Sequence, residues 1–368
     1  MEALSSADLP EGIRARMVPD VNGLTMHVLE AGDPNRPCVL LLHGFPELAF
    51  SWRRVMPGLA AAGYYVVAPD QRGYGRTTGA DTSYDGDLYG FRMTNLVRDV
   101  LGLLGALGIK STAGVVGHDF GANLASWCTL IRPDIFKTMT IMSAPFAGPP
   151  ALVAPKDDIH RELAVLDRPR KHYHWYYSTR EANNDMVHAR QGLHDFLRAY
   201  FHHKSADWEE NKPFKLAGWT ATELAKIPTY YVMDHDRTMA ETVAPHMPTA
   251  EQIAANQWMT EVEMSVYSRE YGRVGFQGGL QCYRCRTEKV GLQEMQMFHG
   301  RTIDVPSMFI SGEADWGVRQ TPGAFEKMQS TACTAMKDVH LLPGAGHWVQ
   351  QEQWEKVTAL LVEFLGRR

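Results

Sequence analysis

The sequence predicts an α/β fold in which a mostly parallel sheet is flanked by helices and interrupted by a mainly helical insertion. Short apolar runs alternate with helical patterns over residues 1–145 and return over residues 301–368. Such alternation is typical of a parallel sheet with helices on both faces. Residues 146–300 instead carry few strand-like runs and many aromatic residues, histidines and helical patterns. We therefore expect one core formed by 1–145 and 301–368, and a helical cap formed by 146–300.

Six apolar runs are expected to form the parallel strands. Four precede the cap, at residues 38–42, 64–68, 113–116 and 138–142, and two follow it, at 305–311 and 340–342. Helices are expected at residues 95–107, 121–131 and 357–365, and the only strand-like run inside the cap covers 229–233. Ligands of open parallel sheets bind beyond the carboxyl ends of the strands. A cap inserted at that edge would cover the binding site.

The composition is that of an ordinary soluble protein. The chain has 368 residues, 45% of them hydrophobic, and a net charge of −5, so a basic nucleic-acid-binding face is not expected. The first residues do not resemble a signal peptide, and no apolar run reaches the roughly 18 residues of a membrane span. Five scattered cysteines favour a reduced, cytoplasmic protein. The composition does not distinguish a monomer from a homodimer.

Cys282 and Cys285 form a CxxC sequence. With no second cysteine pair nearby, we expect two residues on one helix face rather than a metal or redox site. His172, His174, His202 and His203 likewise lack the paired spacing of known metal sites, so no metal is expected.

Asp119 occupies the centre of a Gly-x-Asp-x-Gly motif at residues 117–121. The motif has the glycine frame of a nucleophile elbow, with aspartate where lipases have serine. It follows an apolar strand run and precedes a helix of small residues, which is the context that an elbow requires. The alternative is an aspartate that only caps the helix. We predict that Asp119 is a nucleophile.

Two further residues follow in the chain order of an α/β-hydrolase triad, which is nucleophile, acid and histidine. Asp315 follows the run at 305–311, and His347 follows the run at 340–342. Glu313 is the competing acid, but Asp315 lies further into the loop. The other position for such an acid, after 138–142, reads Ser143-Ala144-Pro145 and offers none.

The segment His43-Gly44-Phe45-Pro46 follows the first core strand. In this kind of fold the second N–H of the oxyanion hole comes from this position. We assign the hole to the backbone N–H groups of Phe45 and Phe120, and we regard His43 and Pro46 as pocket candidates. The segment can also be read as a tight turn, and both interpretations are compatible.

A carboxylate nucleophile restricts the chemistry. Attack on a carbonyl would form an anhydride, whereas attack on a saturated carbon forms an alkyl ester that water can hydrolyse. Asp119 therefore predicts displacement at a saturated carbon in two steps. His347 would activate water and Asp315 would orient the imidazole, as in a serine triad. No metal or organic cofactor is expected.

Several motifs together resemble the epoxide hydrolase branch of the α/β-hydrolases. They are HGFP at 43–46, GHDFG at 117–121, Asp315 and GAGHW at 344–348. GFQGGLQCYR at 275–284 resembles the branch's cap motif, and PDQRGYG at 69–75 matches as well. The resemblance covers about residues 21–364. It implies an α/β-hydrolase fold with a helical cap, a small apolar epoxide as substrate, and no cofactor.

The resemblance also implies two ring-opening acids in the cap, usually both tyrosine. One lies eight residues before the GF of the cap motif, which gives Tyr267. The other opens the aromatic segment at 173–177 and is Tyr173, or His174 in a different register. Trp175, Trp316 and Trp348 are further candidates for the substrate pocket.

Two other functions remain as alternatives. A dehalogenase shares the aspartate nucleophile, and His174 and Trp175 with Tyr267 could bind a halide. Against a haloacid substrate, the helix after Asp119 has no arginine to hold a carboxylate. A non-catalytic binding protein is the other alternative, since a fold does not determine function. Residues 183–252 make the cap long and have no assigned role.

Overall fold

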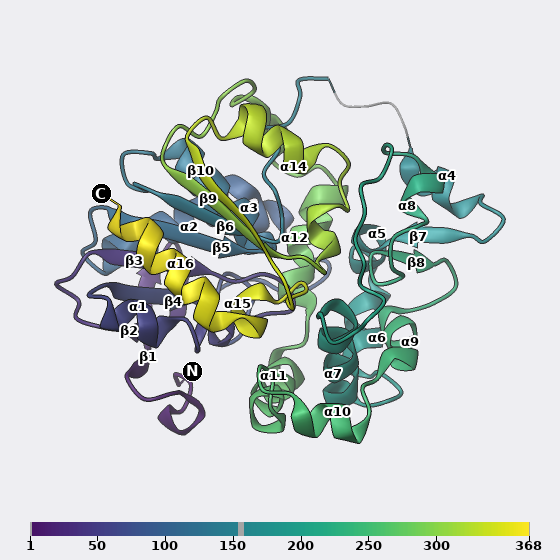
Figure 1. Cartoon of the computed structure of the whole chain (residues 1–368), viewed down its shortest axis with the longest axis horizontal. Helices are drawn as coiled ribbons and strands as arrows, with labels where there is room; N and C mark the ends of the chain where they lie inside the picture. The colour runs from purple at the N-terminus through teal and green to yellow at the C-terminus, as the bar shows by residue number, and fades with distance from the viewer. Residues whose placement is uncertain (1, 154–157, 368) are drawn as a thin grey trace.

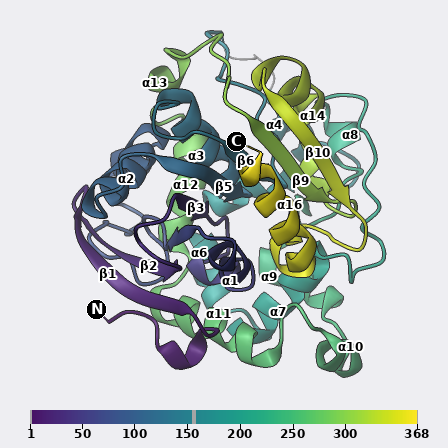
Figure 2. The same ribbon diagram turned by 60° about the vertical axis from the view of Figure 1, so that its left-hand side comes forward.

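The computed structural model describes residues 2–153 and 158–367. An eight-stranded sheet lies between two layers of helices (Figures 1 and 2). The first two strands pair antiparallel with their neighbours and the other six are parallel, as expected. In spatial order the strands are β1 (Ile13–Val21), β2 (Leu24–Ala31), β4 (Tyr65–Pro69), β3 (Cys38–Leu42), β5 (Thr112–His118), β6 (Met139–Met142), β9 (Ser307–Gly312) and β10 (Met336–Leu342).

Helices cover both faces of the sheet because their apolar residues recur at helical spacing. On one face lie α1 (Met56–Ala61) and α16 (Trp354–Gly366), whose buried side chains form one core with that side of the strands. On the other face lie α2 (Met93–Ala106) and α3 (Phe120–Ile131), with α14 (Ala324–Lys327) and a π-helical turn, Met328–Ala332, near the last strands. The central strands β3 and β5 are buried along their whole length, as expected of strands covered on both faces.

The predicted strands are confirmed as β3, β4, β5, β6, β9 and β10, with boundaries that move by up to four residues. The hairpin of β1 and β2 was not expected. β1 is an edge strand with several exposed residues, so its sequence lacks a strong apolar signal. The hairpin extends the parallel sheet by two antiparallel strands and leaves the order of the six parallel strands unchanged.

The chain between β6 and β9 lies beside the carboxyl ends of the strands (Figure 1). It is mainly helical and contains one small antiparallel pair, β7 (Arg170–His172) with β8 (Val232–Asp234). Its helices are α4 (Ile159–Ala164), α5 (Tyr173–Tyr177), α6 (Glu181–Val187), α7 (Leu193–Lys204), α8 (Ala221–Leu224), α9 (Met239–Val243), α10 (Ala250–Ala255), α11 (Glu261–Val274), α12 (Gln277–Thr287) and α13 (Leu292–Gln296).

Helix α12 lies between the core and the remaining cap helices (Figure 1), and it packs against α5 and against the short helix η3 (Leu88–Phe91). Cys282 and Cys285 are buried one turn apart on this helix and are unpaired, which confirms the expected helix-face arrangement. Helix α12 is thus one of the elements through which the cap joins the core.

Two glycines explain part of the sequence motifs at this junction. A Cβ atom at Gly278 would lie 1.9 Å from the carbonyl oxygen of Gly73, so the contact leaves no room for a side chain. Gly73 also has a φ of +83°, which L side chains rarely adopt. The glycines of the 69–75 loop and of the cap motif are therefore required for one direct backbone contact.

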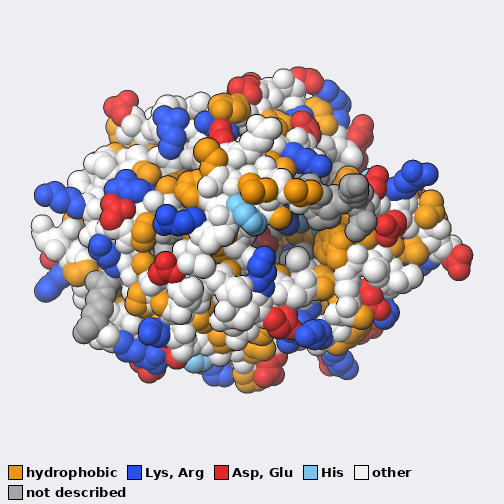
Figure 3. Space-filling model, turned by 90° about the horizontal axis from the view of Figure 1, so that it is seen from above, with side chains coloured by type: hydrophobic (Ala, Val, Ile, Leu, Met, Phe, Trp, Pro, Cys, Tyr) orange, Lys and Arg blue, Asp and Glu red, His pale blue; other side chains and the backbone are white. Residues whose placement is uncertain are grey.

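No helix within residues 2–153 and 158–367 combines the length and the apolar composition needed to span a bilayer. On the face seen in Figure 3, outside its grey atoms, basic, acidic and hydrophobic side chains are intermixed.

We predict that Gly278→Ala lowers the free energy of unfolding by about 1–3 kcal/mol, because the added methyl group must displace backbone atoms. Urea unfolding of the purified variant measures the change. Gly105→Ala is the matched control: a Cβ atom added at this position of α2 would meet no other atom within 4 Å, so the same substitution should raise stability by about 0.5–1 kcal/mol. Equal effects at the two positions would refute the close-contact explanation.

Candidate active site

The chain turns sharply at Asp119, between β5 and α3. Asp119 has φ 52° and ψ −117°, a conformation that costs backbone strain and is held by its surroundings. A Cβ atom at Gly117 would lie 2.1 Å from the carbonyl oxygen of Gly121, and one at Gly121 would lie 2.2 Å from that of Leu42. Both motif glycines are therefore needed for close backbone packing, and the turn is the predicted elbow.

The Asp119 carboxylate lies against the loop that follows β3. Its Oδ1 atom accepts a hydrogen bond of 3.0 Å from the backbone N–H of Phe45. A Cβ atom at Gly44 would lie 2.5 Å from the same oxygen, so glycine is required there too. Phe120 is the first residue of α3, where a backbone N–H has no partner within the helix. The Phe45 donor predicted for the oxyanion hole is thus in contact with Asp119.

His347 lies between the two predicted carboxylates. Its Nδ1 atom is 3.1 Å from Oδ1 of Asp315, and its Nε2 atom is 3.7 Å from Oδ2 of Asp119. Asp315 is buried and also accepts hydrogen bonds from Ser311 Oγ and the Gly317 N–H. Burial opposes ionisation of Asp315, but the His347 imidazole and the Gly317 N–H outweigh it and help to lower the pKa of this carboxyl to about 2. The structure therefore brings the three residues together.

Glu313, the competing acid, is exposed. The polar group after β6 is Ser143, whose Oγ lies 2.9 Å from Nδ1 of His347. Ser143 has φ 67°, and its hydroxyl also helps to lower the pKa of Asp315. The sequence signal for this residue is its position directly after a strand, where a hydroxyl can reach the histidine as an acid would.

The loop that carries His347 is held from two sides. Glu352 accepts hydrogen bonds of 2.8 and 2.9 Å from the N–H groups of Gly346 and Trp348, which flank the histidine. The His347 N–H donates to the carbonyl oxygen of Lys204, at the end of α7. The cap helix α7 thus fixes the backbone of the core histidine directly.

The side chain of Lys204 is buried among aromatic rings. Its Nζ lies 4.7 Å from the ring centre of Tyr231 and between 5.3 and 5.8 Å from those of Tyr200, Trp348 and Tyr230. Within the described chain this ammonium has no carboxylate partner. Burial lowers the pKa of Lys204 to about 8, although Asp119 and Asp315 oppose the shift.

The positive charge of Lys204 acts on the histidine. Burial is the largest cause that lowers the pKa of His347, and Lys204 is the next, while Asp315 opposes them. The other charged groups that face the imidazole are His118 and Asp119. His347 is therefore expected to be neutral, and able to accept a proton, at neutral pH.

A buried ion pair between His118 and Glu47 holds the backbone around Asp119 and His347. His118, next to Asp119, lies with Nδ1 2.5 Å from Oε2 of Glu47, and its Nε2 donates to the carbonyl oxygen of His347 over 2.7 Å. Glu47 also accepts from the N–H of Gly44 and from the amide of Gln350. The pairing with His118 lowers the pKa of Glu47 to about 2 against the effect of burial. Burial opposes a charged His118, but Glu47 outweighs it and raises the pKa of the imidazole.

A cavity of about 410 Å³ is lined in part by Asp119. The core contributes Asp119, Phe120 and Asn123, and the cap contributes residues of α5 and α12. Tyr173, His174 and Tyr283 are the cap residues in this lining whose side chains could donate a proton to a substrate. Burial raises the pKa of both tyrosines well above 10, with the Asp119 charge as the next cause, so their hydroxyls remain proton donors.

Tyr267 does not lie where the resemblance implies. It does not line the cavity, and its hydroxyl lies 2.6 Å from Ser51 Oγ and 3.3 Å from Gln351 Oε1. Helix α11 is oriented so that this face packs on the loop after β3 rather than over Asp119. Tyr283 lies in the cap motif that the sequence identified, but its side chain was given no role there. Its hydroxyl forms no hydrogen bond with a described residue.

Five of the six residues expected in the substrate pocket do not line the cavity. His174 does. His43 is a structural residue, because its Nδ1 donates to the Gly44 carbonyl and its Nε2 accepts from the Gln71 N–H. The indole of Trp175 stacks on His160 instead. The remaining three, Pro46, Trp316 and Trp348, are buried outside the cavity lining.

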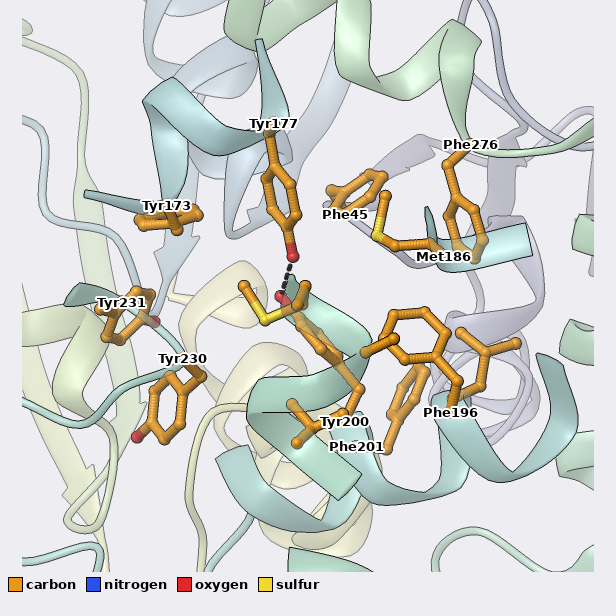
Figure 4. Close-up of a cluster of buried hydrophobic side chains, with 14 of the residues drawn as sticks. Phe45, Tyr173, Tyr177, Met186, Phe196, Tyr200, Phe201, Tyr230, Tyr231 and Phe276 are labelled. Carbon is orange, nitrogen blue, oxygen red and sulfur yellow. Dashed lines mark hydrogen bonds between the residues drawn. The ribbon is translucent and has the colours of Figure 1, made fainter. Parts of the chain in front are cut away.

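Aromatic side chains of the cap form one buried cluster together with Phe45 of the core (Figure 4). The hydroxyls of Tyr177 and Tyr200 point toward each other and are 3.2 Å apart. Tyr173 packs edge to face on Tyr177, and the Phe45 ring contacts Tyr177 as well. Pairs of this geometry add stability beyond the area they bury, and they hold Tyr173 against the cavity.

Comparisons with known proteins agree with this geometry. Residues 37–353 match the family described as alpha/beta hydrolase fold. The chain is 32% identical to "Epoxide hydrolase A" of Mycobacterium tuberculosis, over 94% of this chain and 95% of that protein. It is 31% identical to an "Epoxide hydrolase" of Caballeronia sordidicola, over 98% and 96%.

Solved structures show the same similarity. An "Epoxide hydrolase from an endophytic Streptomyces" superposes with a TM-score of 0.78 at 29% identity, covering 97% of this chain and 96% of the other. Potato (Solanum tuberosum) epoxide hydrolase I superposes with a TM-score of 0.76 at 29% identity, covering 97% and 100%.

We predict that Lys204→Met raises the pKa of His347, because the substitution removes a neighbouring positive charge and keeps an apolar stem inside the aromatic cage. Histidine NMR titration of the folded protein measures the shift. The direction follows from the charge: without the ammonium, the imidazolium is less disfavoured and forms at a higher pH. Lys337→Met, on an exposed position of β10, is the control and should leave the titration unchanged. A fall in the His347 pKa in the Lys204 variant would contradict the assignment.

Proposed function

We propose that Asp119 is the nucleophile of this chain, which belongs to the α/β-hydrolase fold family and hydrolyses epoxides. The observation that carries the proposal is the position of the Asp119 carboxylate. Oδ1 accepts a hydrogen bond of 3.0 Å from the Phe45 N–H, Oδ2 lies 3.7 Å from Nε2 of His347, and Asp119 lines the cavity. One oxygen is thus held by an oxyanion-hole donor and the other is available to a substrate.

In the first step, Oδ2 of Asp119 attacks one carbon of the epoxide. The bond from that carbon to the epoxide oxygen breaks, and the oxygen takes a proton from a cap tyrosine. The product of this step is an alkyl ester of Asp119. A carboxylate suits this displacement because the ester it forms can be hydrolysed afterwards.

In the second step, Nε2 of His347 takes a proton from water, and the resulting hydroxide attacks Cγ of the ester. The negative charge develops on Oδ1, where the Phe45 N–H already donates, and we assign the second donor to the Phe120 N–H. One such donor is typically worth about 3 kcal/mol of transition-state stabilisation. Asp315 stabilises the imidazolium while this intermediate forms. The bond from Cγ to Oδ2 then breaks, the leaving alkoxide takes the proton from the imidazolium, and the diol leaves with Oδ2. The carboxylic acid left on Asp119 returns a proton to the tyrosinate, which restores both groups.

We propose Tyr173 and Tyr283 as the ring-opening acids. Both line the cavity with Asp119, from α5 and α12, and both remain protonated at neutral pH because of their raised pKa values. His174 also lines the cavity, but burial lowers its pKa well below 6.5 and leaves it neutral. A neutral imidazole is a weaker acid than the hydroxyl of a tyrosine, so we prefer the tyrosines as proton donors. The halide pocket of a dehalogenase, with Trp175 and Tyr267, is not assembled around this cavity.

We predict that His347→Gln permits alkylation and blocks ester hydrolysis. Incubation with a terminal epoxide should add the mass of one substrate to the Asp119 peptide, while steady-state turnover falls by a factor of at least about 10³. Intact-mass and peptide mass spectrometry measure both effects. Asp119→Asn combined with His347→Gln should give no adduct. An adduct on another residue, or none in the single variant, would remove Asp119 from the nucleophile role.

We predict that Tyr283→Phe and Tyr173→Phe each slow ring opening by about 10²-fold, since a positioned general acid typically contributes that much or more. Rapid-quench measurement of adduct formation in the His347→Gln background isolates this step. Tyr267→Phe is the matched control, because its hydroxyl bonds Ser51 and Gln351 and the alkylation rate should not change. The assignment fails if Tyr267→Phe slows alkylation while Tyr283→Phe does not.

A further inference from the structure

The wall of the cavity formed by α12 ends in two basic residues. Cys282, Tyr283, Cys285, Arg286 and Lys289 all line the cavity. Cys282, Tyr283, Cys285 and Arg286 lie three and four positions apart on α12, which places them on one helix face. Lys289 follows in the turn after the helix ends at Thr287 and has φ 59°.

Neither cation has a partner within the described residues. The Arg286 and Lys289 side chains form no ion pair and no hydrogen bond there, and both residues are exposed. Their basic neighbour Arg284 is instead bound to Glu288 at 2.9 Å. Nearby Arg92 is bound to Glu294 in the same way. The two cavity cations are thus left free while the surrounding arginines are neutralised.

The rest of the cavity does not supply the missing negative charge. Among its described lining residues Asp119 is the only acid, and the proposed reaction uses its carboxylate as the nucleophile. His172 and His174, the other titratable bases on the wall, are neutral because burial lowers the pKa of each, and the charge of Arg286 lowers it further. Much of the remaining lining is apolar, including Phe91, Trp127 and Met295.

We propose that Arg286 and Lys289 form an anion subsite and that the substrate is an epoxide with an apolar body and a carboxylate. This rests on the proposed function and specifies the substrate class of the same site. Side chains of a helix lean toward its N-terminus, so the Arg286 guanidinium is directed back toward Tyr283. The positive charge of Arg286 acts to lower the pKa values of Tyr173 and His174, which agrees with this direction.

The helix sets the separation between the two ends of such a substrate. Arg286 follows Tyr283 by three positions, which corresponds to about 4.5 Å along a helix axis, and Lys289 lies in the turn after the helix end. With the epoxide between Asp119 and Tyr283, the carboxylate therefore lies at least about 5 Å away. A chain of medium length with the epoxide at one end and the carboxylate at the other fits this separation.

The experiment compares two probes of equal length, an epoxyoctanoate with a terminal epoxide and the corresponding primary amide. At low ionic strength kcat/KM for the carboxylate should exceed that for the amide by about tenfold, mostly through KM, as expected of two partly exposed charge pairs. Salt should reduce the ratio because it screens exposed charges. Arg286→Gln with Lys289→Gln should bring the ratio close to one by lowering kcat/KM for the carboxylate.

The control removes the same charge elsewhere. Arg301 and Lys337 are exposed and do not line the cavity, so Arg301→Gln with Lys337→Gln should preserve the ratio. A ratio near one in the unmodified protein, or a ratio that survives in the Arg286 and Lys289 variant, would overturn the subsite while diol formation continues. Failure of the proposed function is distinct: neither probe would yield a diol, and no adduct would form on Asp119 in His347→Gln.

Discussion

The buried carboxylate of Glu47 is the constraint on which the site depends. It binds the Gly44 N–H, the imidazole of His118 and the amide of Gln350, which belong to three different parts of the core. Through His118 it also reaches the backbone of His347. Breaking a buried ion pair by removing one partner typically costs about 3–5 kcal/mol. A single carboxylate therefore sets the relative positions of the oxyanion-hole loop, the elbow and the histidine loop.

The arrangement of Asp119, Asp315 and His347 could be predicted from the sequence because its signals are local. The elbow is specified by glycines two positions before and two positions after Asp119, and each glycine is required by a close backbone contact. Asp315 and His347 were found from their positions after strand runs, since strand ends of a parallel sheet meet at one edge. Strand boundaries were less accurate, and the antiparallel hairpin at the sheet edge had too weak a pattern to be recognised.

The cap could not be predicted to the same depth, for a physical reason. A helix has several faces, and which face meets the nucleophile depends on packing between helices that are distant in sequence. Tyr267 shows this: the motif located the correct helix, but the structure turns this residue toward Ser51. Tyr283 and Ser143 show the converse, because both approach the site from positions that the sequence placed correctly but to which it assigned no role.

The direct backbone contact between Gly73 and Gly278 has a consequence for how this architecture can diversify. It clamps α12, and with it one wall of the cavity, to the core. Helix α10 has no buried side chain and does not line the cavity. Insertions and deletions there would leave the packing around the reacting groups in place. The length of the cap can therefore change during evolution at such exposed segments. Gly73 and Gly278 are expected to be retained together, because their contact requires both.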